Sequence, residues 1–148
     1  MRPFRTSQLK ALYWVVTLLF IIPQAWSAFQ YLLDAPRMSN AIAALGYPEY
    51  FQNILGVAKL LGVAAIVSGI SPTLKEWAYA GFTFDVCGAL ASHVSVGDPT
   101  WVVAVPAVFL AVQLGSYALW KRLEALQAGR RRRYLLGERT RELAGSGA

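Results

Sequence analysis

The chain alternates between long apolar blocks and short polar interruptions. Four blocks, each close to the ~20 residues that a helix needs to cross a bilayer, run over residues 9–33, 50–70, 74–94 and 100–120. Because lipid offers the backbone no hydrogen-bond partners, each block is expected to be a helix. The last two connections are short, which places successive helices antiparallel. The pattern predicts an all-α integral membrane four-helix bundle with up-down-up-down order, which forms one transmembrane domain over residues 1–120.

Two polar segments complete this organisation. Residues 34–49 contain breakers that favour turns, so a loop is expected there: Pro36, Gly46 and Pro48. Residues 121–148 are predicted to form a basic cytoplasmic tail, which either only fixes the topology as a basic flank or also continues as a helix along the membrane surface. Four consecutive arginines of this tail are expected to attract anionic lipid headgroups: Arg130, Arg131, Arg132 and Arg133.

The distribution of charge orients the expected bundle. The net charge is +6, but the cations gather at the chain ends and not on a surface suited to nucleic acid. Arg2 and Arg5 precede the first block and Lys10 lies at its start, eight cations follow the last block, and Arg37 is the only cation in the first connection. Cytoplasmic flanks of membrane helices are enriched in Lys and Arg. Both termini are therefore predicted to lie inside, in the cytoplasmic (inner) membrane of a bacterium.

The first block also has features of a signal peptide, with Ala25-Trp26-Ser27 as an alternative cleavage site. The apolar character nevertheless continues to Leu33. A cleaved signal would not need this continuation, so the block is expected to remain as a membrane anchor.

Two opposite charges are expected near the middle of the membrane. Lys59 lies midway along the second block and Asp85 midway along the third. Because these helices run antiparallel, both side chains fall at one depth, where an isolated charge costs ~2.5–3.5 kcal/mol. We therefore predict an ion pair or hydrogen bond between them. Small residues beside Asp85, among them Gly81 and Gly88, are expected to admit a neighbouring helix.

Other polar side chains within the blocks are candidates for the same site. Gln24 lies in the first block, Gln113 and Tyr117 in the fourth, and Tyr79 and His93 nearer the ends of the third. Two interpretations stay open. In one, the cluster is a structural lock that fixes the register of the helices. In the other, it lines a pocket or relay for a small polar-headed ligand, such as a quinone, or for a proton.

Signatures of catalysis and of metal binding are absent from the sequence. No HExxH, GxSxG, phosphate loop or closely spaced carboxylate dyad occurs. A single histidine excludes haem ligation by two histidines. Cys87 is the only cysteine, which excludes an internal disulfide, and it is expected to be a small buried hydrophobe. These observations favour a role without catalysis and without a resident metal.

Several short motifs over about residues 10–122 carry a family resemblance. They are Leu45-Gly46-Tyr47-Pro48, Gly56-x-x-Lys59-Leu60-Leu61-Gly62, Lys75-Glu76-Trp77-Ala78-Tyr79-Ala80-Gly81-Phe82, Asp85, Gly88-Ala89, Ser92-His93 and Ser116-Tyr117. With these residues the chain resembles the DoxX-like family of small four-helix bacterial membrane proteins. The resemblance implies a membrane component with a link to quinone or redox chemistry that works beside other subunits. It supplies no catalytic residues.

Three functional hypotheses follow. The leading one is a DoxX-like inner-membrane protein that acts as a non-catalytic redox-associated or ligand-binding subunit, with quinone as the candidate ligand. The alternative is an assembly or interaction protein whose polar cluster is only structural. The third is a transporter of small molecules or protons, which requires an oligomer because four short helices make a poor pore alone.

Overall fold

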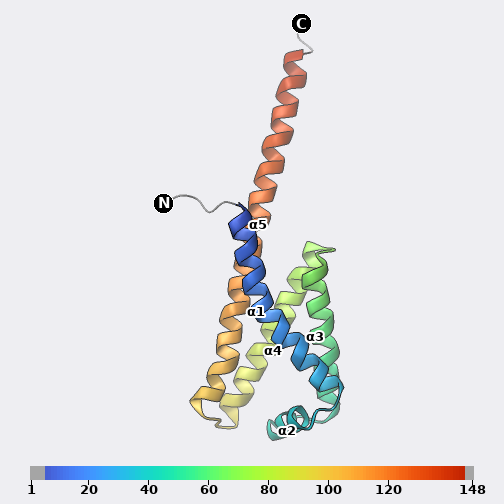
Figure 1. The fold of residues 1–148 in the computed structure, drawn as a ribbon, viewed down its shortest axis with the longest axis vertical. Coiled ribbons are helices and arrows are strands. Elements are labelled where there is room, and N and C mark those ends of the chain that lie inside the picture. Colours follow the sequence, from blue (N-terminus) through green and yellow to red (C-terminus); the bar gives the residue numbers. More distant parts are fainter. Residues whose placement is uncertain (1–5, 146–148) are drawn as a thin grey trace.

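The computed structural model describes residues 6–145, which form five helices joined by short connections. These are α1 (Thr6–Leu32), α2 (Pro36–Ala44), α3 (Tyr50–Ser68), α4 (Pro72–Ser95) and α5 (Thr100–Gly145) (Figure 1). Within this part of the chain no strand occurs, which confirms the all-α class. The cations Arg2 and Arg5, used to orient the chain, lie outside the described residues.

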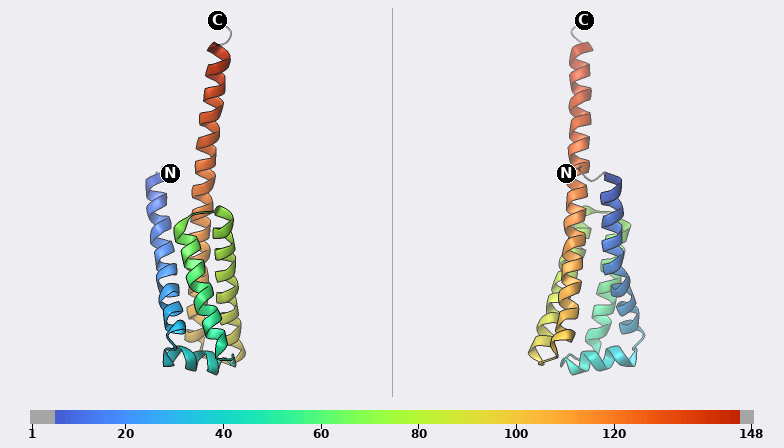
Figure 2. Two further views of the ribbon diagram at one scale, coloured as in Figure 1. Left: turned by 90° about the vertical axis from the view of Figure 1, so that its right-hand side faces the viewer. Right: turned by 60° about the vertical axis from the view of Figure 1, so that its left-hand side comes forward.

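The four long helices lie side by side, and α2 crosses one end of them (Figures 1 and 2). α1 packs against α3 and α5, and α4 packs against the same two helices. Three of the described helices, α1, α3 and α5, are long and apolar enough to cross a membrane. α4, which carries Lys75, Glu76 and Asp85 within its length, is not among these three.

α2 corrects the expected loop between the first two blocks. Pro36 lies in its first turn, where a missing backbone amide costs no helical hydrogen bond. Ile42 is buried. Ser39 donates a hydrogen bond to Oε1 of Gln52 on α3 (3.1 Å), and Nε2 of Gln52 donates to Oδ1 of Asp34 (2.5 Å). These contacts hold α2 against the bundle, so the prolines and glycines mark the ends of a short helix.

α5 continues as a helix well beyond the expected fourth span. Its C-terminal part projects past the other helices and stays in line with the rest of α5 in every view (Figures 1 and 2). The structure therefore shows no bend after residue 120 that would turn this segment away from the direction of α5. Leu123 is 6% exposed because it packs against Leu9 and Tyr13 of α1. Helix packing thus extends past Trp120.

Two glycines of α3 allow neighbouring helices to approach closely. A Cβ atom at Gly56 would lie 2.7 Å from Cγ of Leu32, and one at Gly62 would lie 2.7 Å from Cε2 of Phe82. Phe82 packs edge-on against Phe20 of α1, with 5.0 Å between ring centroids. This contact forms the centre of the apolar core.

Two of the small residues beside Asp85, Gly81 and Gly88, were expected to admit a neighbouring helix and do not. A Cβ atom at Gly81 or Gly88 would meet no other atom within 4 Å. Both positions border open space, so these two glycines leave room beside α4 and make no close helix contact. Cys87, expected to be buried, is exposed on the same helix.

Candidate functional site

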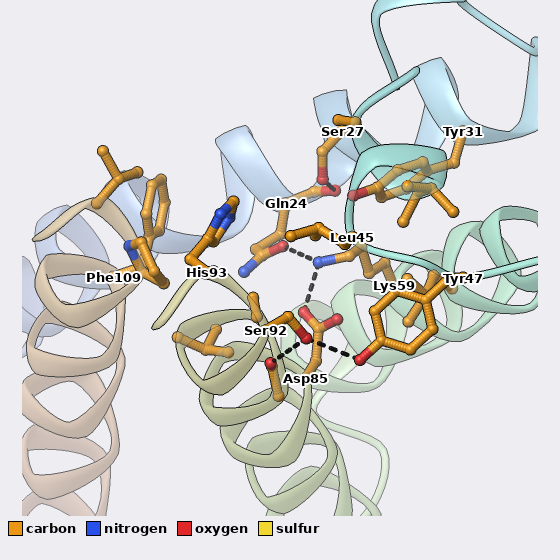
Figure 3. A pocket seen from close by; sticks show the side chains of 18 of the residues that line it. Gln24, Ser27, Tyr31, Leu45, Tyr47, Lys59, Asp85, Ser92, His93 and Phe109 are labelled. Atoms are coloured by element: carbon orange, nitrogen blue, oxygen red, sulfur yellow. Dashed lines mark hydrogen bonds and ion pairs between the residues drawn. The ribbon is translucent and has the colours of Figure 1, made fainter. Parts of the chain in front are cut away.

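Lys59 and Asp85 form an ion pair between α3 and α4, which is the contact expected from their common depth. Nζ of Lys59 donates to Oδ2 of Asp85 (2.5 Å) and to Oε1 of Gln24 on α1 (2.7 Å). The Lys59 and Asp85 side chains are only 10% and 18% exposed. Figure 3 shows the ammonium between the amide and the carboxylate. Three helices therefore meet at one polar centre.

This centre keeps hydrogen-bonding capacity for a further partner. The Lys59 ammonium has three hydrogens, and the described residues accept two of them. Oδ1 of Asp85 has no hydrogen bond to the described residues and is not enclosed. One donor and one acceptor thus remain available beside each other, which suits a ligand that both accepts and donates a hydrogen bond.

A cavity of about 350 Å³ adjoins this centre and is bordered by all five helices (Figure 3). Roughly 300–1,000 Å³ is usual for small-molecule sites. Its residues are mostly apolar or aromatic, with a few polar groups among them. Ala41 and Ile42 of α2 border one end. The hydroxyls of Tyr47, which follows α2, and Ser92 of α4 share a hydrogen bond of 2.8 Å beside it.

His93 borders the same cavity from the C-terminal end of α4. Its Nδ1 lies 2.6 Å from Oδ2 of Asp98, in the connection to α5. A carboxylate at this nitrogen fixes the orientation of the ring and leaves Nε2 for other contacts. Of the residues proposed from the sequence, this cavity brings together Lys59, Asp85, Gln24 and His93.

The other predicted residues belong to a second polar cluster, between α1, α4 and α5. Nε2 of Gln113 donates to the backbone oxygen of Tyr79 (2.8 Å) and to Oγ1 of Thr83 (2.7 Å). The Tyr79 hydroxyl shares a hydrogen bond of 2.7 Å with Ser116. Tyr117 packs edge-on against the Tyr79 ring. None of these five side chains borders the Lys59–Asp85 cavity.

An apolar layer occupies the helical turns between the two polar groups. On α1, Phe20 follows Thr17 of the second cluster and precedes Gln24 of the first. On α4, Phe82 lies between Tyr79 and Asp85 in the same way. The two rings pack against each other in the core. The single central site expected from the sequence is therefore two sites.

Lys75 is a buried cation that sequence reasoning missed as a site residue. It is 7% exposed, its Nζ donates to the hydroxyl of Tyr13 (2.6 Å), and it lies 5.1 Å from the Trp120 ring centroid. Lysine beside a polar turn is typical of a membrane flank, which hid its burial. The aromatic residues at the matching ends of the first and fourth blocks were the signal that could have revealed it.

Lys121 makes the ionic contacts at the neighbouring surface. Its Nζ lies 2.7 Å from Oε2 of Glu124 and 2.9 Å from Oε1 of Glu76. The carboxylates of Glu124 and Glu76 raise the pKa of Lys121 above its ordinary value. Arg130, Arg131, Arg132 and Arg133 are exposed farther along α5. Among the described residues, no group of three His, Cys, Asp or Glu side chains is placed to hold a metal ion.

Comparison with known proteins identifies the family of the chain. Residues 15–116 match the profile described as the DoxX-like family, which confirms the resemblance drawn from the motifs. The matched region runs from α1 into α5 and includes Lys59, Asp85, Gln24 and His93. No curated protein and no solved structure matches the chain.

Proposed function

This chain belongs to the DoxX-like family, and we propose that it is a non-catalytic membrane subunit that binds a small polar-headed ligand beside Lys59 and Asp85. Its apolar helices point to a membrane protein. The observation that carries the proposal is the 350 Å³ cavity whose border includes a nearly buried ion pair with a spare donor and acceptor. Buried charge pairs add little stability by themselves, so their presence at a cavity favours a binding role.

A quinone is the ligand class that suits this cavity best. Its carbonyl oxygens accept from an ammonium, and the hydroxyls of the reduced form donate to a carboxylate, so the centre can hold either state. Tyr31, Tyr47 and Phe109 line the cavity with aromatic rings that suit a flat ring between them. The family resemblance to quinone-linked proteins points to the same class.

In this proposal α1, α3, α4 and α5 all cross the inner membrane of a bacterium, and both termini lie in the cytoplasm. α4 spans because its central charge is paired within the bundle and is not left in lipid. A Cys87→Ser background with one cysteine placed at Ser146 or at Asn40 tests the orientation. A charged maleimide added outside intact cells should label position 40 and leave position 146 unlabelled. The reverse labelling would contradict the orientation.

The arginines of the α5 extension are proposed to bind anionic lipid headgroups. All four are exposed on the part of α5 that projects past the other helices, and arginine clusters that follow a membrane helix attract anionic headgroups: Arg130, Arg131, Arg132 and Arg133.

Calorimetry of the full chain in lipid nanodiscs tests the ligand proposal. The probe is a dimethoxy-methyl-benzoquinone without a side chain. Saturable binding is expected, and Asp85→Asn should weaken it about tenfold, which corresponds to about 1.4 kcal/mol. Thr17→Val, in the second polar cluster, is the matched control and should bind as the parent does. No saturable heat, or equal affinity in Asp85→Asn, would refute the proposal.

A second candidate is an assembly protein in which Lys59, Asp85 and Gln24 only fix the register of three helices. It is favoured by the fact that these residues bond to one another within one chain. Under this function the double variant Lys59→Met/Asp85→Leu keeps the fold and any co-purifying membrane subunits. Under the ligand proposal the double variant keeps the fold but loses binding of the benzoquinone. A transporter would instead appear as an oligomer on crosslinking in lipid.

A further inference from the structure

A second cavity, of about 240 Å³, also ends at the Lys59–Asp85 pair. Its walls come only from α3 and α4, whereas the first cavity is bordered by all five helices. Leu55, Lys59 and Asp85 border both cavities. The ion pair therefore stands where two spaces of different character meet.

The second cavity is an apolar groove along the outer face of the bundle. Apart from the ion pair, every residue that lines it is apolar, including Leu61 and Trp77. These two side chains are 66% and 75% exposed, so the groove is open to the surroundings of the helices. From Asp85 to Leu74 it follows α4 for about 16 Å, at 1.5 Å per residue. Within a membrane its open side faces lipid chains.

The groove exists because of two glycines with opposite surroundings. Gly62 is covered by Phe82, whose ring leans toward α3 and forms part of the groove wall. Gly81, one residue before Phe82, has open space where a side chain would be. A larger residue at position 81 would fill the groove, and the glycine keeps it free.

We propose that the ligand is a membrane amphiphile whose polar head occupies the first cavity and whose single apolar chain lies in the groove between α3 and α4. This inference rests on the proposed function, since the head is the ligand part that Lys59 and Asp85 would hold. Continuity carries the assignment: the apolar groove begins at the same two side chains that offer the free donor and acceptor. A ligand bound in this way keeps its apolar chain in apolar surroundings.

The apolar chain of the ligand contributes packing to the binding free energy and not hydrophobic transfer, because this part of the ligand is surrounded by hydrocarbon both before and after binding. Its effect on affinity should therefore be modest, and the groove should select for a chain by shape. This reasoning sets the size of the effect to be measured.

Two glycine variants of α4 separate the head from the chain. Gly81 borders only the groove and Gly88 only the first cavity, and a Cβ atom at either position would meet no other atom within 4 Å. The probes are the benzoquinone without an alkyl chain and its decyl derivative. Each is titrated into the full-length protein in nanodiscs. Gly81→Leu should weaken the decyl compound about fivefold and leave the chainless one unchanged. Gly88→Leu should weaken both, and Val108→Leu, on exposed α5 surface, should weaken neither.

Trp77 supplies a second readout inside the groove. A benzoquinone with a brominated decyl chain should quench tryptophan fluorescence, and half of the quenching should be reached at the same ligand concentration as half of the binding. Trp77→Phe should remove most of this quenching. Equal loss of both probes in Gly81→Leu, an unchanged decyl affinity, or quenching that survives Trp77→Phe would overturn the groove assignment. If the chainless probe binds and responds to Asp85→Asn in these cases, the proposed function stands and only the chain site fails. If the chainless probe does not bind the parent, the proposed function fails.

Discussion

The ammonium of Lys75 donates a 2.6 Å hydrogen bond to the hydroxyl of Tyr13, although the two residues lie 62 positions apart in the chain. Lys75 is buried, its carboxylate neighbour in sequence, Glu76, pairs with Lys121, and no acidic side chain reaches its Nζ within the described residues. Two aromatic rings, of Tyr13 and Trp120, lie about this cation instead. The contact ties the start of α4 to α1 and α5.

Removing the Tyr13 hydroxyl should therefore destabilise the protein. Tyr13→Phe leaves a buried ammonium short of one acceptor, for which about 1–3 kcal/mol is expected. Lys75→Met removes the charge and keeps the stem, so it should be nearly neutral, and it should abolish most of the cost of Tyr13→Phe in the double variant. Thermal unfolding followed by circular dichroism in mild detergent measures all three. If Tyr13→Phe and Lys75→Met each lower the stability by the same amount and the double variant loses the sum, the hydrogen bond between the two residues does not stabilise the protein.

Replacing one member of the Lys59–Asp85 pair should destabilise the protein more than replacing both. Lys59→Met leaves Asp85 without its cation, with an expected loss of about 3 kcal/mol. This is the lower end of the range for buried pairs, because Asp85 keeps 18% exposure. Lys59→Met/Asp85→Leu should recover most of the loss. Unfolding by denaturing detergent measures these differences, and a double variant weaker than Lys59→Met would contradict the argument.

Alanine should be tolerated at one glycine of the α3–α4 contact and not at the other. Gly62→Ala pushes a methyl group against the Phe82 ring, and overpacking of this kind costs about 1–3 kcal/mol. Gly81→Ala meets open space and should unfold at the parent temperature or slightly above it, because alanine favours the helix. A comparison of melting temperatures decides the point; similar losses at both sites would contradict it.

Leu123, which is 6% exposed, should contribute to stability although it lies past Trp120 on α5. Leu123→Ala exposes the cluster with Leu9 and Tyr13 and should cost about 2 kcal/mol, the lower end for buried leucines. Leu126, 42% exposed, is the matched control, and Leu126→Ala should be near neutral. A loss for Leu126→Ala as large as that for Leu123→Ala would contradict this assignment.

Tyr47→Phe should speed exchange of the benzoquinone probe. The hydroxyl ties the segment after α2 to Ser92 beside the cavity, and a hydrogen bond is worth about 1 kcal/mol. If opening of this segment limits release, the dissociation rate should rise about fivefold while the association rate also rises, so that affinity changes less. Stopped-flow fluorescence in nanodiscs measures both rates. Unchanged rates would show that the ligand leaves by another path.

Much of the fold was predictable because apolar length and antiparallel connections constrain a membrane chain strongly. The ion pair followed from depth alone, since neither Lys59 nor Asp85 is stable in lipid without a partner. α2 was missed because its prolines and glycines favour turns locally, and only the contacts of Ser39 and Gln52 show that a helix packs there. The expected depths in the membrane placed Gln113 and Gln24 in one site. The structure divides them by the contact between Phe20 and Phe82, which the sequence does not show.

By itself the sequence determined that the chain is helical, that it suits a membrane, and that two opposite charges meet within the bundle. Hydrophobic periodicity and the cost of charge in lipid act locally along each helix, so they can be read from residue order. Only the tertiary structure decided which small residues give contact and which leave space. Gly62 and Gly81 are equivalent in the sequence, but the Phe82 ring lies against Gly62 and leaves the space beside Gly81 open. That choice depends on how helices distant in sequence rotate against each other, and it shapes both cavities beside Lys59 and Asp85.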